Sequence, residues 1–122
     1  MAQVMNYKDL IVWQKGMELA ELIYSITSRY PSLEMYSLVS QMRRAAVSVV
    51  SNIAEGKGRD SKLEYLHFLS IARGSVTELE TQLLLSIRLK YIDQAAAEPS
   101  LALCDEISRM LNSMRSKIKA AP

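Results

Sequence analysis

Residues that build disulfides and metal centres are scarce in this chain of 122 residues. It has one cysteine, Cys104, and one histidine, His67. A single thiol cannot close an internal disulfide, and neither residue has a second cysteine or histidine at the spacing that metal sites use. The sequence therefore excludes a disulfide framework, and we expect neither a metal nor a cofactor.

Long apolar runs are also missing. No stretch approaches the roughly 18 consecutive apolar residues of a membrane span, and no charged segment leads into a short apolar run with a cleavage site. The chain is nevertheless 49% hydrophobic, which is enough to build a core. We expect one domain over residues 1–122 in a cytoplasmic protein that makes no membrane contact.

Strand-type alternation is absent, whereas apolar residues recur at three- and four-residue spacing in four segments. We expect these segments to be helices over about residues 9–30, 37–56, 61–92 and 99–118. The breaks between them are only a few residues long, so consecutive helices should run antiparallel. The predicted fold class is all-α, an antiparallel up-down-up-down four-helix bundle.

Glycine and proline punctuate these segments. Pro31 ends the first helix, and Gly56 and Gly58 suit a left-handed turn after the second. Pro99 fits the first turn of the fourth helix. Gly74 lies inside the third helix, where a glycine costs about 1 kcal/mol relative to alanine, and it predicts the close approach of a neighbouring helix.

The second helix carries a polar row beside its apolar stripe, and its members recur at helical spacing. They are Gln41, Arg44, Ser48, Asn52 and Glu55. The flanking residues are apolar, so the row is either bonded within the protein or presented to a partner, and the sequence leaves both open.

If the row is internal, its partners should come from the antiparallel third helix. Arg44 would pair with Glu78 or Glu80. The amide and hydroxyl members of the row would bond across to polar residues of the third helix: Gln41, Ser48 and Asn52 to Ser75, Thr77 or Gln82. On this interpretation Arg44 is engaged in the fold, whereas Arg43 is not.

The net charge of +2 is too small to indicate a nucleic-acid-binding protein by itself. The basic residues are, however, locally concentrated around the second and third helices. The candidate phosphate contacts are Arg43, Lys57, Arg59, Lys62 and Arg73. A second basic run, from Arg109 to the end of the chain, contains no acidic residue.

Catalytic patterns are weak. His67 has no second histidine nearby, and Glu55, Glu78 and Glu80 lack the Glu-x-x-His elements of carboxylate-bridged helical bundles. We therefore predict no catalytic residue and a protein that is not an enzyme.

The first helix shows more aromatic surface than one bundle seam can bury. Trp13, Tyr24 and Tyr30 lie beside an already complete apolar heptad stripe. This excess predicts self-association.

Four segments resemble a known family: residues 7–15, 40–48, 51–59 and 71–80, including Ser-Asn-Ile-Ala-Glu-Gly at 51–56 and Gly-Ser-x-x-Glu-Leu-Glu at 74–80. They resemble the four-helix bundle proteins encoded within intervening sequences of bacterial 23S rRNA genes. The resemblance covers about residues 7–92. Ser37 departs from the glycine common at that position, but serine also caps a helix.

The resemblance implies a cytosolic homo-oligomer, with a pentameric ring as the expected arrangement, and no established enzymatic activity. A related family, the accessory variability determinant proteins of diversity-generating retroelements, shares the bundle and binds nucleic acid through a basic surface. By analogy, the partners of this chain would be copies of itself and RNA or DNA. The alternative is a structural module that binds a protein partner, such as a nucleic-acid enzyme, and no nucleic acid.

Overall fold

Four long helices make up the protein. The structure, a computed structural model, describes residues 6–122. A short 3-10 turn, η1 (Tyr7–Asp9), precedes α1 (Ile11–Thr27), and a second one, η2 (Ser32–Glu34), precedes α2 (Leu38–Lys57). Then follow α3 (Lys62–Arg88) and α4 (Gln94–Ala120), and there is no strand in the described part of the chain.

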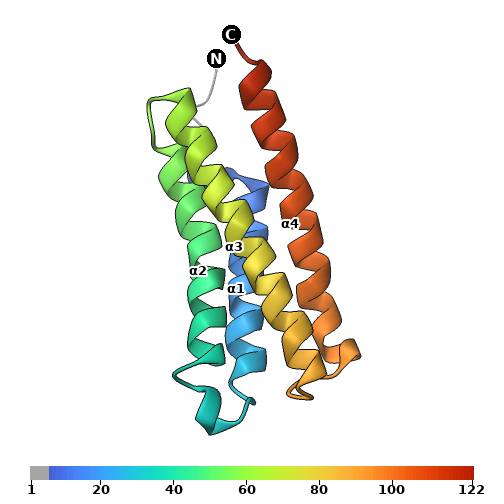
Figure 1. Ribbon diagram of the computed structural model, residues 1–122. Coiled ribbons are helices and arrows are strands. Elements are labelled where there is room, and N and C mark those ends of the chain that lie inside the picture. Colours follow the sequence, from blue (N-terminus) through green and yellow to red (C-terminus); the bar gives the residue numbers. More distant parts are fainter. Residues whose placement is uncertain (1–5) are drawn as a thin grey trace.

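The helices alternate in direction along the bundle (Figure 1). Packing contacts join α1 to α2, α2 to α3, α3 to α4, and α4 back to α1, so each helix has two neighbours. The all-α, up-down-up-down four-helix bundle predicted from the apolar spacing is thereby confirmed. No helix within residues 6–122 is long and apolar enough to cross a membrane.

The predicted apolar stripes form the core. Among the fully buried side chains are Leu19, Ile23, Met42, Val49, Ile53, Leu69, Leu79, Leu83, Ile107 and Leu111. Burying one such side chain contributes roughly 1.5–3 kcal/mol, so the four seams together supply most of the stabilisation. Tyr30 also belongs to this core. It was expected to contribute to an outward aromatic surface, but it packs against Tyr91, with ring centroids 5.4 Å apart.

The fourth helix begins earlier than predicted. Asp93 caps it by accepting a hydrogen bond from the Ala96 backbone N–H at 2.8 Å, and the helix then continues through Pro99. Pro99 was expected to open the helix, because proline fits a first turn best. An aspartate at the N-cap satisfies the otherwise unpaired amides of the first turn, which places the start at Gln94.

The backbone of the turn between α2 and α3 adopts a right-handed conformation, whereas its two glycines predicted a left-handed one. Gly58 has φ −82°, and no glycine has positive φ in the described chain. Gly56 instead serves packing, because a Cβ there would lie 2.9 Å from Cβ of Phe68. It allows α3 to approach the end of α2 closely and so positions the turn that follows.

Candidate nucleic-acid interface

The five predicted phosphate contacts do not share one face. Arg43 turns toward α1, where its Nε donates to the Thr27 hydroxyl at 3.0 Å and its guanidinium lies over the Tyr24 ring. Arg73 turns toward α4 and donates to the Asn112 side-chain oxygen at 2.9 Å. The α1–α2 side and the α3–α4 side are opposite each other in this bundle, so no single ligand surface includes both residues.

The other three predicted contacts meet a second basic segment at one end of the molecule. Lys57 ends α2, Arg59 lies in the turn, and Lys62 opens α3. Figure 1 shows this turn at the same end of the bundle as the C-terminus of α4, and the Lys62 ammonium donates to the Ala121 carbonyl. We call the set that is thus brought together, Lys57, Arg59, Lys62, Lys117 and Lys119, the basic end.

Most of the charge of the basic end is free to act on a ligand. Arg59 forms an exposed ion pair with Glu55 at 3.6 Å, and its guanidinium lies over the Phe68 ring. Lys57, Lys117 and Lys119 form no ion pair with any residue between 6 and 122. Exposed cations without acidic partners can contact phosphates without first losing an internal interaction.

Lys117 and Lys119 were not among the predicted contacts. The acid-free basic run to which they belong was visible in the sequence. The position of this run beside the α2–α3 turn could not be seen in the sequence, because it depends on how far α4 extends relative to α3. The signal that finds them is the antiparallel order of the helices, which brings the end of α4 to the start of α3.

The polar row of α2 is only partly internal. Ser48 shares a 2.8 Å hydrogen bond with Ser75 of α3, as predicted, while Asn52 donates back to the Ser48 carbonyl at 2.8 Å. Gln41, Arg44 and Glu55 are exposed. The Glu55 side chain pairs with Arg59, at the basic end. The middle of the row is therefore hydrogen-bonded, whereas both of its ends are exposed to solvent.

The predicted ion pairs of Arg44 are not formed. Neither Glu78 nor Glu80 lies within 4.0 Å of Arg44. Glu78 is exposed and accepts a hydrogen bond from Gln82 at 3.3 Å. Glu80 turns the other way, toward α4. Burial raises the pKa of the Cys104 thiol to about 12, and the nearby charge of Glu80 contributes the smaller part of this shift. Helical spacing alone could not separate the two glutamates.

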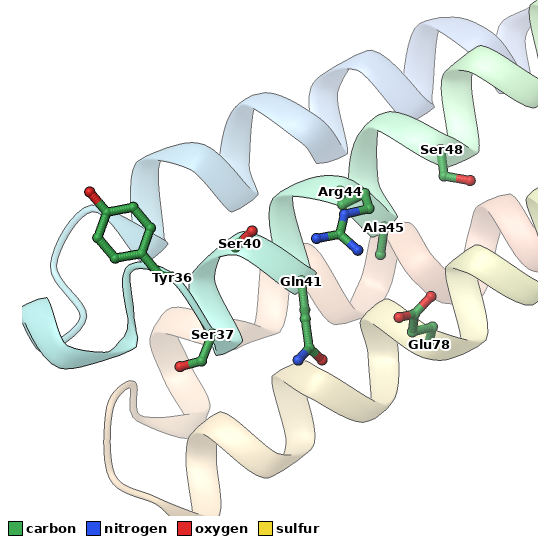
Figure 2. A pocket seen from close by; sticks show the side chains of 8 residues that line it. All are labelled: Tyr36, Ser37, Ser40, Gln41, Arg44, Ala45, Ser48 and Glu78. Carbon is green, nitrogen blue, oxygen red and sulfur yellow. The ribbon is translucent and has the colours of Figure 1, made fainter.

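Arg44 and Glu78 instead line a polar pocket between α2 and α3 (Figure 2). Its volume is about 370 Å³. We call it the α2–α3 pocket, and its residues are Tyr36, Ser37, Ser40, Gln41, Arg44, Ala45, Ser48 and Glu78. The first three turns of α2 supply most of these side chains. Sequence reasoning missed Tyr36, Ser37 and Ser40 because they precede the polar row.

The outer face of α3 is apolar in several places. Leu63 and Leu85 are 78% and 45% exposed, and they lie eleven residues before and after Gly74, about three helical turns in each direction, on the side of α3 that faces away from the core. Gly74 lies on the same side, and a Cβ added there would meet nothing within 4 Å. The predicted close approach at Gly74 is therefore not made by any helix of this chain.

No group of three or more histidine, cysteine, aspartate or glutamate side chains is placed to hold a metal ion within the described residues. His67 is exposed, and its ring meets that of Phe68 at 5.7 Å between centroids. The structure instead brings together the cations of the basic end, and it places Arg44 and Glu78 in the α2–α3 pocket.

Comparison with known proteins agrees with this architecture. The family model described as 23S rRNA-intervening sequence protein matches residues 8–113. A solved structure from Bacteroides thetaiotaomicron, a protein of unknown function from the S23 ribosomal protein family, is 27% identical with a TM-score of 0.78. The match covers 86% of this chain and 98% of that one. No curated protein matches the chain.

Proposed function

Because the chain belongs to the 23S rRNA-intervening sequence protein family, we propose that it is a cytoplasmic, non-enzymatic homo-oligomer that contacts the phosphate backbone of RNA or DNA. The basic end carries the contact. The observation that supports this proposal is the meeting of two basic segments, residues 57–62 and 117–119, from distant parts of the sequence.

A single basic end offers only a weak binding site for nucleic acid. It carries five cations, with Glu55, Asp60 and Glu64 close by in the sequence. An assembly repeats this surface once per copy, and linked weak contacts raise the overall affinity without any new interaction. The proposal therefore requires self-association as well as positive charge.

The outer face of α3 supports self-association. An exposed glycine inside a helix costs about 1 kcal/mol relative to alanine, and no contact within the chain uses the absence of a side chain at Gly74. A helix of a second copy could approach closely there, with Leu63 and Leu85 as its apolar contacts.

A second exposed apolar surface lies on the α1–α2 side, where Met17, Tyr24 and Val47 are each at least 40% exposed. Two unlike apolar faces on one chain favour a head-to-tail contact, which closes into a ring when the rotation between copies permits. The pentamer implied by the family resemblance is one such ring.

The same α3 face supports the second candidate function, a module that binds a protein partner and no nucleic acid. The two candidates differ in one measurable property. We would titrate structured RNA, including the helical stems that flank rRNA intervening sequences, with the assembled protein at several salt concentrations. Binding that weakens steadily with salt supports the nucleic-acid role, because phosphate contacts release counterions. No binding at about 50 mM salt would favour the protein-partner role.

A further inference from the structure

The α2–α3 pocket contains a cation and an anion that are not paired with each other. The Arg44 guanidinium makes no hydrogen bond or ion pair within residues 6–122. Within the same residues, the Glu78 carboxylate accepts a hydrogen bond only from Gln82. Both side chains line the same cavity of about 370 Å³, which is within the range of small-ligand pockets.

These two groups have opposite hydrogen-bonding requirements. A guanidinium offers donors only, in a planar fork, whereas an ionised carboxylate offers acceptors only. A ligand that satisfies both presents acceptors to the guanidinium and donors to the carboxylate, and a planar base can do this with two acceptors on one edge and two donors on another. The Gln82 amide, which is buried, holds one oxygen of the Glu78 carboxylate in place and leaves the other free.

Among the four RNA bases, guanine alone has this arrangement. Its O6 and N7 accept a bidentate bond from arginine, and its N1–H and N2–H₂ form a pair of adjacent donors that suits a carboxylate. Adenine, cytosine and uracil each lack two adjacent donors. Proteins that read RNA sequence bind unpaired bases on these same edges in loops and bulges.

We propose that the α2–α3 pocket binds an unpaired guanine, with Arg44 on its O6/N7 edge and Glu78 on its N1/N2 edge. The inference deepens the proposed RNA contact and rests on it, since it names the part of the RNA that is read. Arg44 lies thirteen residues before Lys57 on α2, so the pocket is roughly 20 Å along the helix from the basic end. The two sites can therefore be altered separately.

The test measures the binding of GMP, IMP, AMP and CMP to the assembled protein by saturation-transfer NMR at about 50 mM salt. All four nucleotides carry the same phosphate, so differences among them report the base. We expect GMP to bind most tightly. IMP lacks the 2-amino group and should bind more weakly.

Two conservative variants separate the two edges. Glu78→Gln should weaken GMP binding at least about fivefold and remove the difference between GMP and IMP. Arg44→Gln should weaken GMP and IMP together, because both bases present O6 and N7. Glu21→Gln and Arg88→Gln, at exposed positions outside the pocket, are the matched controls and should change nothing.

Equal binding of all four nucleotides, no binding of any, or a GMP preference that survives both pocket variants would overturn the inference. The proposed function fails differently. Neutralising Lys57, Arg59 and Lys62 should weaken the binding of structured RNA and leave GMP binding unchanged, because the basic end lies roughly 20 Å from the pocket. RNA binding that depends on these three residues but shows no guanine preference would retain the proposed function and remove only the pocket assignment.

Discussion

Arg43 and Thr27 join the first two helices, with the arginine Nε 3.0 Å from the threonine hydroxyl oxygen. The same guanidinium lies 4.6 Å from the centroid of the Tyr24 ring. Thr27 is buried at the end of α1, where its own hydroxyl donates to the Ile23 carbonyl at 2.6 Å. Arg43 thus completes a hydrogen-bonded chain from the interior of α1 to the surface of α2.

This contact predicts that Arg43 matters more for stability than its neighbour Arg44. Arg43→Ala should lower the free energy of unfolding by about 1–2 kcal/mol, because it removes a charged hydrogen bond and a cation–π contact. Arg44→Ala should cost less than about 0.5 kcal/mol, since Arg44 is exposed and unbonded. Urea unfolding of both variants tests this, and equal midpoints would contradict it. The sequence alone suggested the opposite order.

Glu34 predicts a dependence of stability on pH. Hydrogen bonds from the Ser37 hydroxyl at 2.6 Å and from the Tyr91 hydroxyl at 2.7 Å favour its ionised form, and they hold the pKa of this carboxyl below its usual value. A carboxyl whose pKa is depressed on folding stabilises the fold above its unfolded pKa, and this contribution is lost as the pH falls through the folded value.

We therefore expect Glu34→Gln to lower the melting temperature at pH 7. The difference from the parent protein should shrink as the pH falls below about 4, the usual range for glutamate. Glu18→Gln, at an exposed position on α1 that makes no ion pair with residues 6–122, is the control. A melting-temperature difference that stays constant from pH 7 to pH 3 would show that the charge of Glu34 does not stabilise the connection between α1 and α2.

Gly74 gives the prediction for self-association. Gly74→Arg should break the assembly, because a long charged side chain would stand where a second helix must approach. Light scattering should then shift from a multiple of 13.7 kDa to 13.7 kDa, while the circular dichroism of the helices stays unchanged. Ser113→Arg, on an exposed position of α4, should leave the assembly intact. A parent protein that scatters as a 13.7 kDa monomer at micromolar concentration would refute self-association itself.

Periodicity was sufficient to predict the bundle, because burial on one face of each helix determines which side chains repeat. It failed where a short-range contact overrode the pattern. The Asp93 cap places the start of α4 at Gln94, before Pro99. Packing against Phe68, not turn geometry, explains Gly56.

The candidate sites were harder to predict than the helices. Arg43 and Arg44 are adjacent, and about 100° of helical rotation sends one to α1 and the other to the α2–α3 pocket. The rotation of each helix about its own axis decides such cases, and apolar spacing specifies it only approximately. Lys117 and Lys119 lie near Lys62 because α4 extends far enough for Ala121 to accept a hydrogen bond from Lys62. The length of α4 was underestimated because its start was predicted too late.

The basic end is tested most directly by the salt dependence of RNA binding in the assembled protein, compared with a variant in which Lys57, Arg59 and Lys62 are all changed to Gln. Each phosphate contact contributes roughly 0.7–0.9 to the slope of log affinity against log salt. We expect binding that is weaker for every RNA sequence and a slope that is flatter by about 2, with the oligomer intact. An unchanged slope in this variant would contradict the assignment of the basic end as the nucleic-acid contact.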